Sequence, residues 1–179
     1  MFKKLFIIIF MTLITTNISA QNNKRAYDFT FKSLEGKSLE LSNFKNKVII
    51  VVNVASQCGF TNQYNDMQKI WDNYQDKGVI MLGVPSNDFN QEQDNNSAIK
   101  TFCETNFGIT FPMTEKVSVK GSEAHPFYKW AKDNYGKAAV PKWNFHKIII
   151  DKSGNVAETF SSLTNPSSKR FISAIEKLI

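Results

Sequence analysis

The sequence contains very little cysteine, with only Cys58 and Cys103 among 179 residues. Thr61 stands where a C-x-x-C pair beginning at Cys58 would have its second cysteine, so the usual dithiol of a disulfide oxidoreductase is absent. Histidine is equally scarce: neither His125 nor His146 has a cysteine or carboxylate at metal-ligand spacing. We therefore expect no metal site and no histidine base, and nothing in the sequence implies a cofactor.

Long hydrophobic runs and blocks of like charge are also missing. The apolar segment at residues 5–13 is far shorter than the roughly 20 residues of a membrane span. No run of Lys and Arg is long enough to predict a nucleic-acid or membrane-binding patch. Lys3 and Lys4, the apolar segment, and Ala20 before Gln21 instead form the pattern of a cleaved secretory signal. We expect a protein exported to the periplasm or the medium, and an uncleaved anchor is the alternative.

The remainder of the chain is expected to form a single domain. Removing residues 1–20 takes away two lysines and no acids, so the formal net charge falls from +6 to +4. Residues 21–179 contain no repeat, low-complexity segment or linker, and their length suffices for a full core.

The apolar pattern predicts an α/β fold. Residues 48–54 and 79–84 are continuous apolar runs, typical of parallel strands that are buried on both faces. Two hairpins are predicted, at 27–31 with 38–41 and at 145–151 with 155–160. Helices are predicted at about 62–75, 97–106, 126–133 and 171–179. Right-handed crossovers then make the two apolar strands parallel, and the second hairpin adds antiparallel strands.

Cys58 is the strongest candidate for a reactive group. It follows the buried strand at 48–54 and precedes a predicted helix, and reactive groups of such sheets gather at the carboxyl ends of the strands. A thiol near the start of a helix is typical of a nucleophilic cysteine. A structural disulfide with Cys103 is the plainer alternative for an exported protein.

Several segments resemble the glutathione peroxidase family and occur in the family's order along the mature chain. Residues 53–61 (N-V-A-S-Q-C-G-F-T) resemble its peroxidatic motif, and residues 83–89 (G-V-P-S-N-D-F) resemble its G-F-P-C-N-Q-F segment. Further matches are F-P-M at 111–113, A-H-P-F-Y at 124–128, W-N-F at 143–145 and D-K-S-G at 151–154. The resemblance implies a thioredoxin fold, in which a central mixed sheet is flanked by helices and preceded by an N-terminal β-hairpin.

The resemblance also implies a catalytic tetrad of Cys58, Gln91, Trp143 and Asn144. The family's F-G-x-Q-E-P-G segment appears here as the shorter F-N-Q-E-Q-D, which favours Gln91 and leaves Gln93 as the alternative. In this chemistry a thiolate attacks one peroxide oxygen and becomes a sulfenic acid. The indole N–H and the two amides are neutral donors that stabilise the sulfur anion and the departing oxygen.

Cys103 resembles the resolving cysteine of the thioredoxin-dependent branch, because Ser86 replaces the cysteine of the G-F-P-C-N-Q-F segment. The resemblance implies that Cys103 attacks the Cys58 sulfenic acid and that a thioredoxin-like dithiol protein reduces the resulting disulfide. A disulfide requires Cα atoms within about 7 Å, so we expect the Cys103 helix to unwind locally. A buried, inert cysteine is the alternative.

These features predict a monomeric, cysteine-dependent peroxidase that reduces hydrogen peroxide and organic or lipid hydroperoxides. The monomer is implied by the short connection from Val117 to Trp143, which lacks the insertion of the family's tetrameric members. The alternatives are a one-cysteine peroxidase that uses glutathione, a disulfide oxidoreductase on the same fold, and a peroxide sensor without significant turnover.

Overall fold

The computed structural model describes residues 24–179, so the predicted signal at residues 1–20 lies outside the described part. Its centre is a four-stranded sheet with the strand order β4-β3-β5-β6, and a separate two-stranded sheet pairs β1 with β2. The elements in chain order are β1 (Thr30–Lys32), β2 (Ser38–Glu40), β3 (Val48–Val54), α1 (Gln63–Tyr74), β4 (Val79–Pro85), α2 (Asn96–Phe107), α3 (Pro126–Tyr135), β5 (Lys147–Ile150), β6 (Val156–Phe160) and α4 (Lys169–Glu176).

The central sheet is mixed, as the sequence predicts. β3 and β4 are parallel and are joined through α1, whereas β5 pairs antiparallel with both β3 and β6. Every residue of β3, β4 and β5 is buried. This is expected of strands that are covered on both faces. The sheet order and the N-terminal hairpin confirm the predicted thioredoxin fold.

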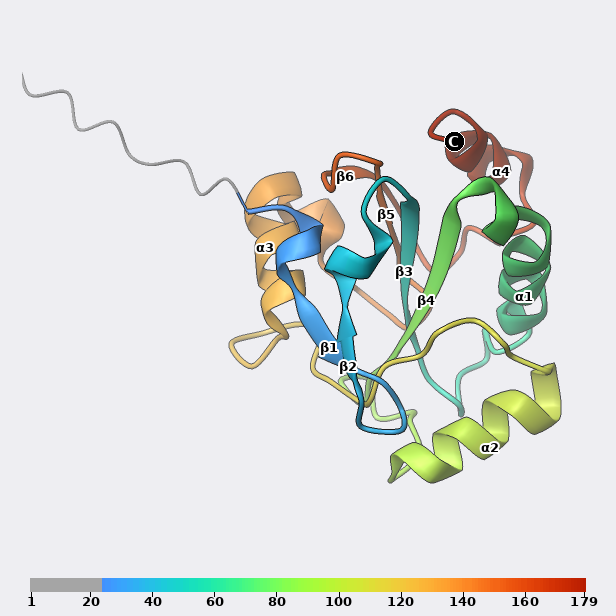
Figure 1. Ribbon diagram of the computed structural model, residues 1–179. Coiled ribbons are helices and arrows are strands. Elements are labelled where there is room, and N and C mark those ends of the chain that lie inside the picture. The colour runs from blue at the N-terminus through green and yellow to red at the C-terminus, as the bar shows by residue number, and fades with distance from the viewer. Residues whose placement is uncertain (1–23) are drawn as a thin grey trace, which may run out of the picture.

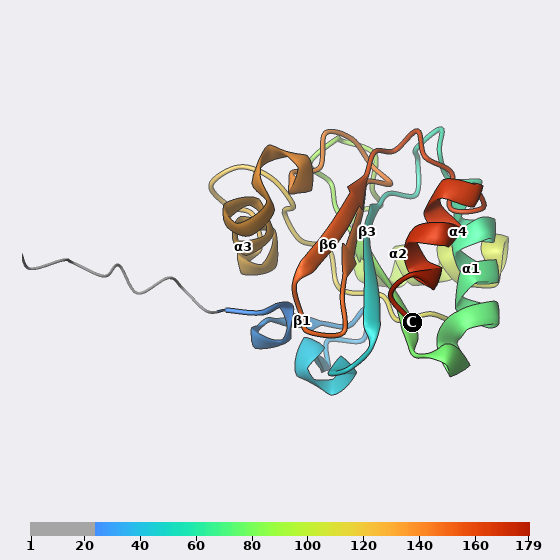
Figure 2. The same ribbon diagram turned by 90° about the horizontal axis from the view of Figure 1, so that it is seen from above.

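Helices cover both faces of the sheet (Figure 1). Seen from above, α1 and α4 lie on one side and α3 lies on the other (Figure 2). The core is correspondingly divided in two, since successive residues of a strand point to opposite faces. Ile50 and Val52 of β3 pack with α1 and α4, whereas Ile49 and Val51 pack with α3 and the N-terminal segment. No helix within residues 24–179 is long and apolar enough to span a membrane.

Two predicted strands begin two or more residues later in the structure. The predicted strand at 27–31 begins only at Thr30, because Ala26–Asp28 forms a 3-10 turn that is tied to the second hairpin by a bond from Ala26 N to Gly154 O (2.9 Å). Gly154 has φ of +82°, and a Cβ there would lie 2.8 Å from the Tyr27 ring. These tertiary contacts override the local alternation of residues 27–31.

The strand predicted at 145–151 begins at Lys147, because Phe145 has a left-handed backbone with φ of +63°. That conformation is unfavourable for a bulky residue. Complete burial of the Phe145 ring against Tyr64, with centroids 5.2 Å apart, offsets the cost. The kink separates the W-N-F block from the regular strand that follows it.

Candidate active site

Cys58 lies at the carboxyl end of β3, at the edge of the sheet where the parallel strands end. Helix α1 begins at Gln63, and a series of tight turns connects it to Cys58, the first of them closed by a bond from Thr61 N to Cys58 O (3.1 Å). The thiol is free and only 4% exposed. Cys58 therefore occupies a sheltered position between a rigid strand and the turns that lead into α1.

Gln91 and Asn144 are brought together, although 53 residues separate them in the chain. Asn144 Nδ2 donates to Gln91 Oε1 at 2.9 Å, and Asn144 is fully buried. The backbone of Gln91 also accepts a bond from Gln57 N at 2.8 Å, next to Cys58. Asn144 therefore contacts Gln91, the glutamine that the sequence favours over Gln93. Asn144 Oδ1 is buried without a partner, and Gln91 Nε2 makes no hydrogen bond within residues 24–179.

Asn53 fixes the segment that carries Trp143 and Asn144, a role of its side chain that no sequence pattern indicated. This residue of β3 is 1% exposed. Its Nδ2 donates to Trp143 O (3.1 Å) and its Oδ1 accepts from His146 N (3.1 Å). Its backbone oxygen accepts from Phe145 N (2.6 Å). The side chain and backbone of Asn53 thus attach the loop around Phe145 to the strand that leads into Cys58.

Trp143 is the most exposed of the predicted site residues, at 41%. Its ring packs against Phe89 with centroids 5.2 Å apart, and its indole N–H makes no hydrogen bond within the described residues. Phe89 precedes the Gln91 loop, so this aromatic contact links the W-N-F block to that loop at the surface. The indole N–H of this partly exposed residue, next in the chain to Asn144, is a donor available to a bound molecule.

The buried side chain of Glu92 joins the segment that precedes Cys58 to the loop that carries Gln91. Its Oε1 accepts from Ser56 N (3.0 Å), Ser56 Oγ (2.5 Å) and Gln93 N (2.8 Å). Its other oxygen is buried without a partner. Burial raises the pKa of this carboxyl, and the three donated bonds oppose that shift. Glu92 therefore connects the strand end that precedes Cys58 to the loop that carries Gln91.

Cys103 lies on α2 and is also free and buried, at 1% exposed. Burial raises the pKa of its thiol to about 11, and the charges of Glu92 and Glu104 act in the same direction. The Tyr64 hydroxyl is close to this thiol and lowers the pKa in part. Burial raises the pKa of Tyr64 well above its usual value, and the charges of Cys103, Glu92 and Cys58 raise it further. Both cysteines therefore lie around one buried tyrosine, but their thiols are not joined.

Both histidines are surrounded by packing and capping contacts of the fold. His125 is the N-cap of α3, where its Nδ1 accepts from Phe127 N (3.3 Å) and its ring stacks on Phe31 with centroids 4.0 Å apart. Burial lowers the pKa of His146 to about 4. No group of three His, Cys, Asp or Glu side chains within residues 24–179 is arranged to hold a metal ion.

Lys147 is a further buried group that the sequence did not indicate. It is fully buried on β5, where its Nζ donates to Gln63 Oε1 (2.5 Å) and to Thr164 O (2.7 Å). Burial lowers its pKa to about 7. Gln63 is the first residue of α1, so this contact fixes the start of the helix that follows Cys58.

Comparison with known proteins agrees with the motifs. The family model described as glutathione peroxidase matches residues 26–132. The hydroperoxy fatty acid reductase gpx1 of Synechocystis sp. is 39% identical over 171 residues, which cover 90% of this chain and 100% of that protein. The glutathione peroxidase-like peroxiredoxin 2 of Saccharomyces cerevisiae is 43% identical over 148 residues, which cover 79% and 90%. The crystal structure of Trgpx in its apo form is similar with a TM-score of 0.67 and 32% identity, over 86% of this chain and 97% of that one.

Proposed function

The chain belongs to the glutathione peroxidase family, and from this we propose that it is a thiol-dependent peroxidase that acts on hydrogen peroxide and on organic or lipid hydroperoxides. The observation that carries the proposal is the hydrogen-bonded pair of Gln91 and Asn144 beside the loop of Cys58. The names of two relatives, a hydroperoxy fatty acid reductase and a peroxiredoxin, support the substrate class and the thiol chemistry.

In the first step the Cys58 sulfur attacks the terminal oxygen of the hydroperoxide. An S–O bond forms and the O–O bond breaks, so Cys58 becomes a sulfenic acid and the other oxygen takes up the thiol proton and leaves as alcohol or water. Gln91 Nε2 and the Trp143 indole N–H are the free donors that we assign to the sulfur and to the departing oxygen. Asn144 orients Gln91 through their mutual hydrogen bond.

In the second step we propose that Cys103 is the resolving cysteine. Its thiol attacks the sulfenic sulfur, so that a disulfide forms and water leaves, and an exchange with a thioredoxin-like dithiol then restores both thiols. The thiol is buried on α2 with a pKa of about 11, which makes it a poor nucleophile where it lies. The helix therefore has to unwind locally before Cys103 can react. Ser86, which replaces the family's loop cysteine, is fully buried and offers no alternative thiol.

A steady-state assay tests this function. Purified protein should consume an organic hydroperoxide with thioredoxin and thioredoxin reductase much faster than with glutathione, and Cys58→Ser should abolish the activity with either reductant. Equal turnover of Cys103→Ser with thioredoxin would show instead a one-cysteine enzyme. Oxidation of Cys58 without repeated turnover under any reductant would indicate a sensor.

Two further expectations belong to the proposal. The leader pattern at residues 1–20 supports export, in which case the reductant is a thioredoxin-like protein outside the cytoplasm. The short connection between Val117 and Trp143 supports a monomer. Fractionation of cells that express the full chain tests the first, and sedimentation of the purified protein tests the second.

A further inference from the structure

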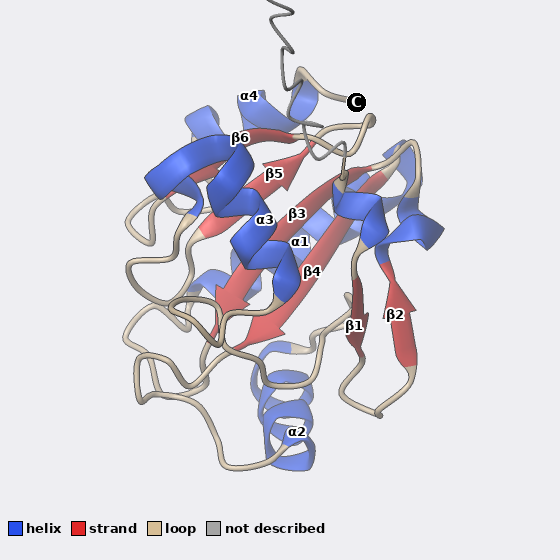
Figure 3. Ribbon diagram, turned by 90° about the vertical axis from the view of Figure 1, so that its left-hand side faces the viewer, coloured by secondary structure: helices blue, strands red, loops and turns tan. Residues whose placement is uncertain are grey.

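Helix α2, which carries Cys103, is held to the rest of the molecule by few contacts. Only Ile99 and Cys103 are buried among its residues, whereas α1 and α3 each bury four; Phe102 and Phe107 of α2 pack against the core but stay partly exposed. Figure 3 shows α2 apart from the layers that cover the sheet, near the ends of β3 and β4. An element with so little buried apolar surface opens at a low free-energy cost.

A cavity separates α2 from the N-terminal hairpin. It has a volume of about 360 Å³, and the Cys103 side of α2 forms one of its walls. The opposite wall comes from the hairpin, and the segment 109–113 forms the remainder; the lining includes Leu34, Leu39, Cys103, Ile109, Phe111 and Met113. Because this space is unfilled, apolar packing between the hairpin and the helix contributes little to holding α2 in place.

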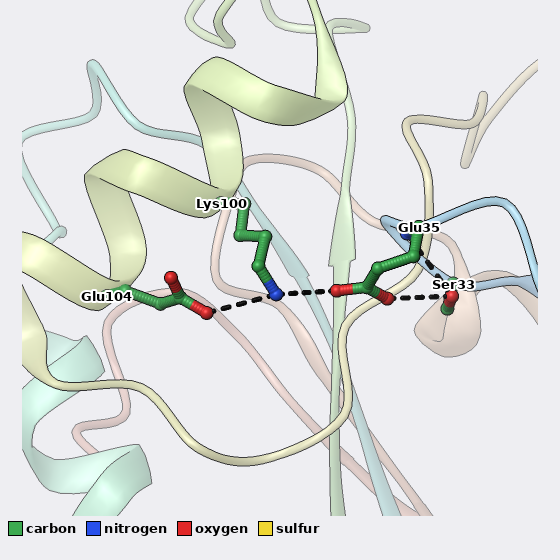
Figure 4. Close-up of polar contacts among 4 residues, drawn as sticks. All are labelled: Ser33, Glu35, Lys100 and Glu104. Carbon is green, nitrogen blue, oxygen red and sulfur yellow. Dashed lines mark hydrogen bonds and ion pairs between the residues drawn. The ribbon is translucent and has the colours of Figure 1, made fainter.

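One ion pair joins α2 to the hairpin beside this cavity (Figure 4). Lys100 Nζ lies 2.6 Å from Glu35 Oε1 and 3.1 Å from Glu104 Oε1. Ser33 Oγ donates to the second oxygen of Glu35 at 2.9 Å and orients the carboxylate. Lys100 precedes Cys103 by three residues, so the two side chains are one helical turn apart. The other side-chain polar contacts between α2 and the rest of residues 24–179 are those of Asn96 Oδ1 with Lys116 N (3.3 Å) and of the Cys103 thiol with the Tyr64 hydroxyl.

The hairpin end of this ion pair is rigid. Leu34 N donates to Met113 O (3.2 Å), and Met113 is bridged in turn to Gly83 of β4. The hydrogen bonds that Lys100 and Ser33 donate lower the pKa of Glu35 to about 2, and those that Lys100 donates to Glu35 and Glu104 raise the pKa of Lys100. Both groups thus stay charged from acid to alkaline pH, so salt rather than pH can weaken the contact.

We propose that Glu35 and Lys100 are positioning residues for the resolving step: their ion pair holds α2 folded against the hairpin and so slows the release of the Cys103 thiol to the Cys58 sulfenic acid. The proposal rests on the proposed function, in which Cys103 must leave its site before the disulfide forms with loss of water. A slow release prolongs the life of the sulfenic acid and exposes it to a second peroxide, which would oxidise it to sulfinic acid.

The first test measures the opening of α2 without catalysis. In a Cys58→Ser background, Cys103 is alkylated with neutral N-ethylmaleimide, and its rate is compared between the parent and the Glu35→Gln and Lys100→Gln variants. Both variants should react roughly two- to fivefold faster, the range expected when an exposed ion pair is lost. The double variant should react no faster than either single one. Glu35→Gln and Lys100→Gln change the local charge in opposite directions. An acceleration in both therefore results from the loss of their ion pair and not from a change in the local electric field.

Two matched controls accompany this measurement. Glu104→Gln removes a charge next to Cys103 but leaves the link to the hairpin, and Glu158→Gln breaks the exposed pair with Arg170 (3.5 Å) far from α2. Glu158→Gln should not alter the rate by more than the error, and Glu104→Gln measures how much acceleration the local field alone causes, because the charge of Glu104 raises the pKa of the Cys103 thiol. Raising the salt concentration should accelerate the parent but not Glu35→Gln. An unchanged alkylation rate in both link variants, or an equal change in Glu158→Gln, would overturn the proposal.

The second test measures whether the Glu35–Lys100 ion pair affects disulfide formation in the catalytic cycle. With both cysteines present, Glu35→Gln should form the Cys58–Cys103 disulfide two- to fivefold faster after one equivalent of peroxide, with an unchanged rate of peroxide attack. It should also withstand a proportionally higher peroxide dose before it is overoxidised. Faster alkylation without a disulfide in any variant would show that the Glu35–Lys100 ion pair restrains α2, and it would refute the resolving role of Cys103. A disulfide that forms at the parent rate despite faster alkylation would refute the effect on catalysis.

Discussion

Replacement of Asn53 by alanine should cost more than its small loss of apolar contact suggests. The side chain is buried on β3 and bonds two backbone groups of the loop that carries Trp143 and Asn144. Its removal leaves the His146 N–H buried without a partner and the Trp143 carbonyl partly so. Each buried group left unpaired costs about 1–3 kcal/mol. We therefore expect Asn53→Ala to lose about 2–4 kcal/mol of unfolding free energy.

The same change should impair the reaction, because the loop holds the indole and the amide at the site. A misplacement of about 1 Å can cost on the order of 10²-fold in rate, so we expect oxidation of Cys58 to slow by roughly ten- to a hundredfold. Urea denaturation measures the stability, and stopped-flow mixing with one equivalent of peroxide measures the rate.

Val51→Ala is the matched control for both measurements. Val51 lies on the same face of β3, two residues before Asn53, and packs in the core without any polar side-chain contact. It should lose about 2 kcal/mol through the missing methyl groups and keep the parent rate of oxidation. A loss below about 0.5 kcal/mol in Asn53→Ala, or an oxidation rate equal to that of Val51→Ala, would refute the role assigned to this amide.

Three other predictions concern the donors and the buried ionisable groups. Trp143→Phe and Asn144→Ala should each slow peroxide attack on the order of 10²-fold while the protein still folds, and unchanged single-turnover rates in folded variants would contradict this. Burial raises the pKa of Glu92, so its proton is held more tightly in the folded state, and the stability it confers is lost as the pH rises above the ordinary value of 4.5. In urea denaturation at a series of pH values, Glu92→Gln should not show this loss of unfolding free energy. A pH profile identical to that of the parent would exclude Glu92 as its source. Burial lowers the pKa of Lys147 to about 7, so the unfolding free energy should rise between about pH 7 and 10.5. Lys147→Met should lack this rise, and a variant that retained it would show that another group titrates.

The parts of the fold that are set by the pattern of apolar residues could be predicted from the sequence. β3 and β4 occupy the continuous apolar runs, because a strand that is buried on both faces needs no polar alternation. The strand that includes Phe145 was predicted too long, because its left-handed backbone depends on bonds to Asn53, a residue more than ninety positions away. Such a conformation leaves no periodic signal in the residues that adopt it.

The candidate site could be proposed from the sequence to the extent that a motif could name its residues. Cys58, Trp143 and Asn144 are candidates from short, continuous blocks, whereas the preference for Gln91 over Gln93 gains its structural support only from the hydrogen bond with Asn144. The link from Glu35 to Lys100 joins two exposed residues whose types are common on any surface. Contacts of this kind depend on tertiary placement, so they appear only once the hairpin and α2 are positioned.

Cys58 is proposed as the peroxide-reactive thiol and Cys103 as the cysteine that resolves its sulfenic acid. Mass spectrometry of unreduced peptides, after one equivalent of peroxide, tests both halves in a single experiment. The parent protein should show an intramolecular Cys58–Cys103 disulfide, and Cys103→Ser should show a Cys58 sulfenic acid that a dimedone-type reagent traps. A parent protein in which Cys58 stays reduced while peroxide is consumed, or in which the two cysteines never become linked, would contradict these two roles.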